Sequence, residues 1–154
     1  MKIQWKKLLI CIVIPLAVGG LSAFLTRDDM QIFESLNQPA LSPPGWLFPV
    51  VWTILYIMMG IASYLVLVSG KPNEEALQAY RAQLFFNFLW SIIFFNLEKY
   101  LLALLWLVGL WVLILLSIVR FYRISKPAGW LMIPYLLWVT FAGYLNFMIW
   151  RLNS

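Results

Sequence analysis

Three tryptophans inside long apolar stretches, Trp52, Trp90 and Trp138, have notable neighbours at helical spacing. Trp90 follows Asn87 by three residues and directly precedes Ser91, and Trp52 precedes Tyr56 by four. Residues three or four apart share one face of a helix. Indole, amide and hydroxyl groups need hydrogen-bond partners that lipid cannot supply, so we expect these faces to turn inward.

A second tryptophan face follows near the C-terminus, where Trp138 precedes Ala142 by four residues and Leu145 by seven. Two interpretations fit these spacings. The groups form a hydrogen-bond network between helices, or they line a pocket with aromatic walls, a few neutral polar groups and no charge. Such a pocket suits a large, flat, apolar ligand, and the spacings alone favour neither interpretation.

The residue types that are absent or rare in the sequence exclude several kinds of metal site and enzyme. It contains no histidine and only one cysteine, Cys11, so imidazole ligation, an internal disulfide and a thiolate metal site are not expected. All six acidic residues fall near helix ends or in loops, whereas an ion-coupled pump places an ionisable group at mid-membrane. We expect no metal, no cofactor and no conventional hydrolytic or redox enzyme.

The composition indicates a membrane protein, since 64% of the residues are hydrophobic and 11% are charged. Residues 8–26, 100–119 and 127–150 carry no charge, and each run is near the roughly 20 residues that cross a bilayer. The fold class predicted is an all-α membrane protein, a single domain over residues 1–154. Its five transmembrane helices are expected at about 8–26, 46–69, 79–97, 100–119 and 128–150.

The first apolar segment also resembles a secretory signal with a cut after Ala23, but its length favours a retained helix. Eight of the 11 Lys and Arg residues fall in the N-terminal segment, the second loop and the fourth loop. The positive-inside rule therefore predicts a cytoplasmic N-terminus in a multi-pass protein, which we expect in a bacterial plasma membrane. The net charge of +5 then reflects topology, and no nucleic-acid partner is expected.

Three sequence blocks resemble one known family. PALSPPGWLFPVVWTILYIMMGIASYLV, NFLWSIIFF and PYLLWVTFAGYLNFMIWRLN occur in the order found in the TspO/MBR family, also called the tryptophan-rich sensory protein, translocator protein or peripheral benzodiazepine receptor family. The resemblance covers nearly the whole chain. It implies a five-helix bundle, often a homodimer, with a ligand cavity inside the bundle and the first loop as its cover.

The resemblance also implies which ligands the protein binds and which residues line its binding pocket. Family members bind porphyrins such as protoporphyrin IX, benzodiazepine- and isoquinoline-type drugs, and sterol-like molecules. Family pocket positions carry over onto Pro43, Trp52, Tyr56, Asn87, Trp90, Trp138, Ala142 and Leu145, and we add Phe33 and Ser91 as ligand-binding candidates. Phe33 and Gln38 replace a family tyrosine and lysine, so a hydroxyl and a charge are missing from the cover.

The first loop of the chain is rich in proline. Pro39, Pro43, Pro44 and Pro49 each lack a backbone N–H and restrict the chain. They predict a pre-ordered lid that brings Trp52 to the mouth of the cavity.

Three functions follow as expectations. The first is binding of tetrapyrroles and similar hydrophobic molecules by a sensor, carrier or scavenger. The second is light- and oxygen-dependent porphyrin degradation, in which Trp52 and Trp138 are the catalytic residues. The third is a membrane protein without a ligand that binds protein partners. Gly60 with Ser63, or Gly109, is a candidate homodimer contact, although ordinary packing within the bundle is the favoured interpretation of these small residues.

Overall fold

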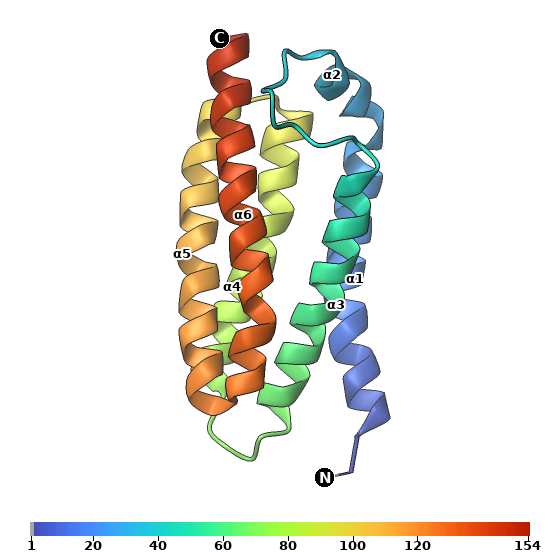
Figure 1. Cartoon of the computed structure of the whole chain (residues 1–154). Coiled ribbons are helices and arrows are strands. Elements are labelled where there is room, and N and C mark those ends of the chain that lie inside the picture. Colours follow the sequence, from blue (N-terminus) through green and yellow to red (C-terminus); the bar gives the residue numbers. More distant parts are fainter. Residues whose placement is uncertain (1) are drawn as a thin grey trace.

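The computed structural model describes residues 2–154, which form a bundle of long helices running side by side (Figure 1). The elements are α1 (Trp5–Thr26), η1 (Arg27–Asp29), α2 (Met30–Ser35), α3 (Leu47–Leu67), α4 (Glu74–Ser91), η2 (Ile92–Asn96), α5 (Tyr100–Ile124) and α6 (Lys126–Asn153). No β-strand occurs among these residues, which confirms the all-helical prediction.

Four segments of the described chain are long and apolar enough to cross a membrane: Trp5–Ser35, Leu47–Leu67, Tyr100–Ile124 and Lys126–Asn153. The chain is therefore a multi-pass integral membrane protein. The remaining long helix, α4, is less apolar because it carries polar residues that the bundle buries. Gln83 and Asn87 are 0% and 2% exposed, so they face other helices rather than lipid.

Most of the helices extend beyond their expected bounds, whereas α3 (Leu47–Leu67) is shorter than the expected 46–69. α4 begins at Glu74, five residues before the expected start, because Glu74 and Glu75 suit the positive N-terminal end of a helix. After Ser91 the helix widens into the π-turn η2. α5 continues to Ile124, and α6 starts at Lys126 with Pro127 in its first turn, where a missing N–H costs little.

α1 and α3 approach closely at Gly60. A Cβ atom on Gly60 would lie 2.7 Å from the backbone oxygen of Cys11 and 2.7 Å from the Cα of Ile12. Gly60 and Ser63 are both buried, so they serve the α1–α3 contact and are not free for a dimer. Gly109 is half-buried, and a Cβ atom there would lie 3.2 Å from the ring of Phe86. A dimer contact at Gly60 and Ser63 does not fit this packing, whereas one at Gly109 stays a prediction.

We expect Gly60→Ala to lower the free energy of unfolding by about 1–3 kcal/mol, because the methyl group meets backbone atoms that cannot rotate away. Gly20→Ala is the matched control on the other helix of this pair, since a Cβ there meets nothing within 4 Å. It should change stability by less than about 0.5 kcal/mol. Thermal unfolding in detergent, followed by circular dichroism, measures both. Equal midpoints for the two variants would contradict this packing.

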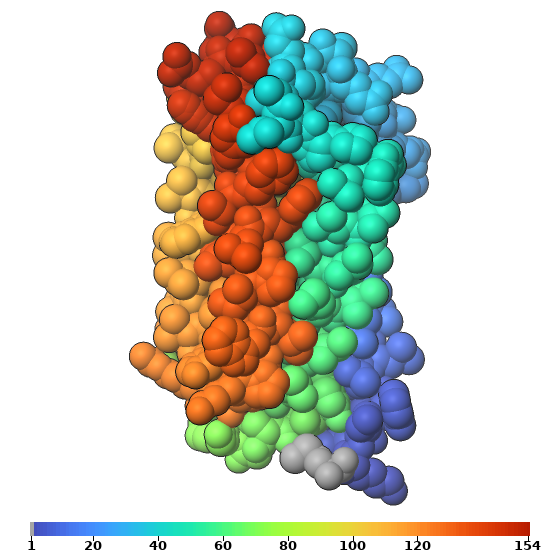
Figure 2. Space-filling view, viewed as in Figure 1, coloured from blue at the N-terminus to red at the C-terminus, as the bar shows by residue number. Residues whose placement is uncertain are grey.

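α2 and the segment after it cover one end of the bundle, beside the C-terminal end of α6 (Figure 2). The cover is tied down by Asn37 and Asn153. The backbone N–H of Asn37 donates to Asn153 Oδ1 at 3.0 Å, and Asn153 Nδ2 donates back to the carbonyl of Asn37 at 3.1 Å. Gln38 Nε2 also donates to the carbonyl of Phe33. These bonds hold the proline-rich segment over the space between the helices.

Candidate functional site

A cavity of about 500 Å³ lies beneath this cover, between α1, α3, the α4–η2 junction and α6. Eight of the ten residues predicted to bind ligand line it: Phe33, Trp52, Tyr56, Trp90, Ser91, Trp138, Ala142 and Leu145. These residues come from four separate elements, α2, α3, α4 and α6. The fold therefore gathers most of the predicted site around one space.

Two predicted residues do not line the cavity. Pro43 belongs to the covering segment and is half-buried outside the lining. Asn87 lies behind Tyr56, whose hydroxyl donates to Asn87 Oδ1 at 3.3 Å. Pro43 can thus act on a ligand only through the cover, and Asn87 only through the tyrosine.

Sequence reasoning missed the contribution of α1. Ser22, Thr26 and Gly19 line the cavity, as do Met30 after them and Phe48 on α3. Thr26 Oγ1 donates to the carbonyl of Ser22 at 2.9 Å, so its hydroxyl is already used. Ser22 and Thr26 stand four residues apart in an apolar run. That spacing was the available signal for an inward face.

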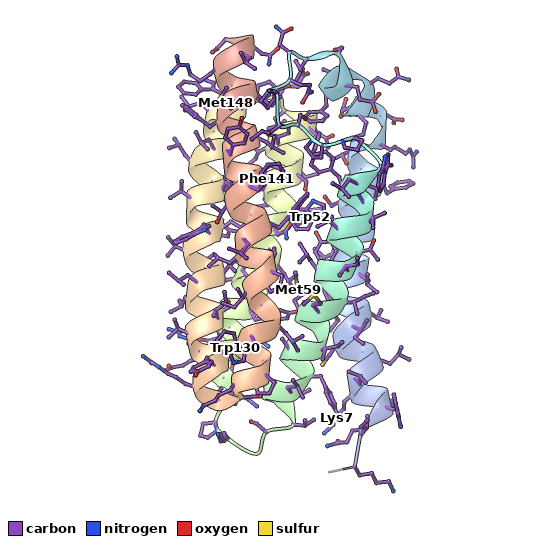
Figure 3. The ribbon with its side chains drawn as sticks, in the orientation of Figure 1. Lys7, Trp52, Met59, Trp130, Phe141 and Met148 are labelled. Atoms are coloured by element: carbon purple, nitrogen blue, oxygen red, sulfur yellow. The ribbon has the colours of Figure 1, made fainter. Side chains whose placement is uncertain are left out.

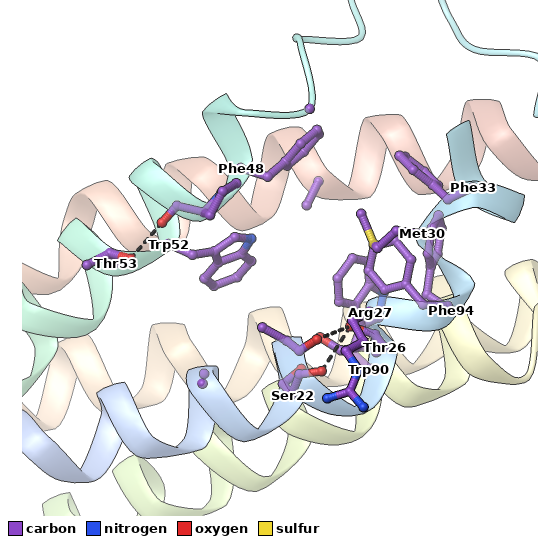
Figure 4. Close-up of a pocket in the computed structure, with 18 of the residues that line it drawn as sticks. Ser22, Thr26, Arg27, Met30, Phe33, Phe48, Trp52, Thr53, Trp90 and Phe94 are labelled. Atoms are coloured by element: carbon purple, nitrogen blue, oxygen red, sulfur yellow. Dashed lines mark hydrogen bonds between the residues drawn. The ribbon is translucent and has the colours of Figure 1, made fainter. Parts of the chain in front are cut away.

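Aromatic rings form the α3–α6 wall. Trp52 stacks on Tyr56 with a centroid separation of 5.5 Å and meets Trp138 edge-to-face at 6.5 Å. Phe48 packs against Trp138 at 5.9 Å. Trp52 lies between α3 and α6, nearer the covered end than Met59 (Figure 3). In the close-up, Phe48 and Trp52 face Met30 and Phe33 across the cavity (Figure 4). A flat ligand would meet aromatic faces and edges here.

A chain of hydrogen bonds ties three helices together behind the cavity. Beyond the bond from Tyr56 to Asn87, Asn87 Nδ2 donates to the hydroxyl of Tyr135 at 2.7 Å. That hydroxyl donates to Gln83 Oε1 at 2.6 Å. The network interpretation therefore holds for Asn87, which holds Tyr56 in place rather than facing the cavity.

The tryptophans divide into bonded and unbonded groups. The indole N–H of Trp90 donates to Asn146 Oδ1 at 3.0 Å, and those of Trp106 and Trp111 also have partners. Trp138 Nε1 is buried and has no partner among the described residues. Trp52 Nε1, drawn on the cavity side of its ring in Figure 4, forms no hydrogen bond with residues 2–154 either. The wall of the cavity therefore contains two indole N–H groups without a partner, and that of Trp138 is buried within the wall.

The cavity interior carries no charge. Arg27 is the one charged residue in its lining, and its guanidinium carbon lies 3.9 Å from the ring centroid of Phe24, an exposed side chain on the outer surface of α1. Arg27 Nε also lies 3.7 Å from Asp28 Oδ1. A ligand inside the cavity would be held by aromatic contact and neutral hydrogen bonds.

We expect Tyr135→Phe to lower the free energy of unfolding by about 1–3 kcal/mol, because it leaves the buried amides of Gln83 and Asn87 without their partner. Tyr122→Phe removes a hydroxyl from an exposed ring and serves as the control, with a change below about 0.5 kcal/mol. Denaturant unfolding in detergent measures both. A Tyr135→Phe variant as stable as the control would show that the network contributes nothing.

Comparison with known proteins agrees with this arrangement. The TspO/MBR family model matches residues 11–151. The chain is 45% identical over 154 residues to "Tryptophan-rich protein TspO" of Chlorobaculum tepidum, covering 97% of this chain and 98% of that protein. It is 39% identical to the protein of the same name from Archaeoglobus fulgidus, over 96% of this chain and 97% of the relative. It is 35% identical to "Translocator protein" of Homo sapiens, over 86% and 80%.

Proposed function

Because the chain belongs to the TspO/MBR family, we propose that it binds porphyrins and similar flat hydrophobic molecules in the cavity, as a sensor, carrier or scavenger. Protoporphyrin IX is the ligand we choose to test, and drug-like isoquinolines, benzodiazepines and sterols are further candidates. The ligand is cargo or signal rather than a resident cofactor.

The single observation that supports this proposal most is an uncharged aromatic cavity with unpaired donors inside a membrane protein. Its volume of about 500 Å³ falls within the range of small-molecule sites. Trp138 Nε1 is buried without a partner, which costs about 1–3 kcal/mol until an acceptor arrives. A porphyrin supplies acceptors in its carboxylates and imine nitrogens, and a flat ring system that matches the wall of Trp52 and Tyr56.

The experiment is a thermal shift in detergent, in the dark. We expect protoporphyrin IX to raise the unfolding midpoint with a concentration dependence set by mass action, about 2.7 kcal/mol at 100 times the Kd. Perylene, which is flat and apolar but has no acceptor, is the comparison ligand and should give a much smaller shift. If no porphyrin concentration moves the midpoint, the proposal is wrong and the third function, partner binding without a ligand, is favoured.

A second candidate function is light-driven porphyrin degradation. It is favoured by one observation: Trp52 and Trp138, two readily oxidised side chains of the cavity, lie edge-to-face at 6.5 Å on the same wall. The porphyrin itself would absorb light and activate oxygen. Illumination of the complex in air should then bleach the main porphyrin absorption band, and the Trp52→Phe/Trp138→Phe variant, once saturated with ligand, should bleach more slowly. Equal bleaching rates would argue against a catalytic role of these residues.

The proposed topology has five membrane spans, with α4 as the fifth, and a cytoplasmic N-terminus in a bacterial plasma membrane. α4 and η2 together run from Glu74 to Asn96 alongside α5, and the buried Gln83 and Asn87 account for the low hydropathy of α4. An odd number of spans places Ser154 outside the cell. A thiol reagent that cannot cross membranes should label Ser154→Cys in intact cells, in a Cys11→Ser background. We also propose a homodimer, as the family resemblance implies, through a surface other than Gly60.

A further inference from the structure

The exposed lining residues of the cavity gather on one side of the molecule. They lie near the end of α1 or around the start of α3, and they are Gly20, Ala23, Arg27, Gly45, Pro49 and Thr53. The lining contributed by α4, η2 and α6 is buried or half-buried. The cavity is therefore open between α1 and α3 and closed toward the rest of the bundle.

Four of these residues form what we call the side window: Gly20 and Ala23 of α1, and Pro49 and Thr53 of α3. None has a side chain long enough to bridge the two helices. A Cβ atom on Gly20 would meet nothing within 4 Å. The neighbouring Gly19 is different, because a Cβ there would collide with the ring of Tyr56. The helices thus touch at Gly19, whereas Gly20, which also lines the cavity, has open space beside it.

The side window lies within the membrane-spanning part of both helices. Gly20 precedes Thr26, the last residue of α1, by six residues, and Thr53 follows Leu47, the first residue of α3, by six. At 1.5 Å per residue, both sit about 9 Å inside the ends of their helices. Both helices belong to the segments that are long and apolar enough to cross a bilayer. The side window therefore faces lipid rather than water.

The covered end of the cavity, by contrast, is held shut. Phe33 of α2 packs edge-to-face on Phe95 at 5.3 Å and tilted on Phe94 at 5.7 Å. Asn37 and Asn153 exchange hydrogen bonds that join the cover to α6. A ligand entering from the water above would have to break these contacts, whereas a ligand dissolved in the bilayer meets an open window.

We propose that the ligand enters and leaves the cavity from the lipid bilayer through the side window between α1 and α3. The inference rests on the proposed function, and it selects molecules that partition into membranes. A substituent at Gly20 that fills the side window should slow both entry and exit. The loss of a binding contact, by contrast, would chiefly speed exit.

The test is stopped-flow transfer of protoporphyrin IX from phosphatidylcholine vesicles to the protein in proteoliposomes, in the dark, with exchange measured in both directions. We expect Gly20→Phe to lower the association and dissociation rate constants each by about tenfold or more. Val13→Phe adds a ring to an exposed site on the same helix, away from the cavity, and should leave both rates within about twofold. Asn153→Ala, which loosens the cover, should also leave them within about twofold.

Two results would overturn the side window alone: rates that Gly20→Phe does not change, or rates that Asn153→Ala speeds several-fold. The second would identify the cover as the entrance. If the unmodified protein shows no saturable transfer, the proposed function itself fails, and the side window fails with it. A circular dichroism melt of Gly20→Phe separates misfolding from obstruction, because a folded variant with slowed exchange in both directions is obstructed.

Discussion

Ala142→Phe is expected to weaken protoporphyrin IX binding at least about a hundredfold, equivalent to about 2.7 kcal/mol or more. Ala142 lines the cavity on α6, four residues after Trp138. A phenyl ring there occupies space that the ligand needs, next to the wall of Trp138 and Trp52. The ring projects into an existing cavity, so the cost to folding should be small. Porphyrin absorbance and fluorescence titrations in detergent measure the affinity.

The control for this substitution is Leu137→Phe, which changes an exposed side chain on the same helix away from the cavity. It should bind as the unmodified protein does. Circular dichroism melts establish that both variants are folded. A folded Ala142→Phe variant with unchanged affinity would place the ligand somewhere other than this cavity.

The double substitution Trp52→Phe/Trp138→Phe should weaken porphyrin binding by about 10- to 100-fold. Both positions keep an aromatic ring, but the two unpaired N–H donors are lost. A hydrogen bond contributes about 0.5–1.5 kcal/mol net, so two give roughly 1–3 kcal/mol. Perylene, without acceptors, should lose much less affinity. The measurement is the ratio of the affinities for protoporphyrin IX and perylene. Both affinities are determined from ligand fluorescence, because the substitutions themselves change the tryptophan emission.

Trp130→Phe is the matched control, because Trp130 is 64% exposed and does not line the cavity. It should leave both ligands' affinities within about twofold. If the double variant loses affinity for perylene and porphyrin equally, ring contact rather than hydrogen bonding holds the ligand, and the role assigned to the two donors is wrong.

Sequence reasoning predicted much of this site because its residues carry distinctive types. Trp90 and Trp52 have the polar residues Asn87 and Tyr56 three and four residues away, and the motif blocks that contain them are specific. The TspO/MBR resemblance is confirmed by the family match over residues 11–151. The two interpretations of the polar groups proved compatible. Asn87 and Trp90 bond inside the bundle, while Trp52 and Trp138 have no partner.

The other features of the site depend on how the helices pack against one another, which the sequence does not show. The sequence around Gly20 does not show that a Cβ atom there would meet no atom within 4 Å. Nor does the sequence around Gly60 show that this residue contacts the backbone of α1. Both are glycines in apolar runs. Likewise, the bonds between Asn37 and Asn153 join residues 116 positions apart. The wall contributed by α1 was missed because Ser22, Thr26 and Gly19 are ordinary residues in a membrane helix.

The central claim is that this cavity binds one tetrapyrrole. The most direct measurement is an equilibrium titration of purified protein with protoporphyrin IX, in the dark, at protein concentrations above and below the Kd. The account predicts saturable binding of one porphyrin per chain, with tryptophan quenching in the unmodified protein, and loss of both in Ala142→Phe. Non-saturable uptake that is the same in the two proteins would show that the porphyrin dissolves in the detergent or at the surface, and it would contradict the account.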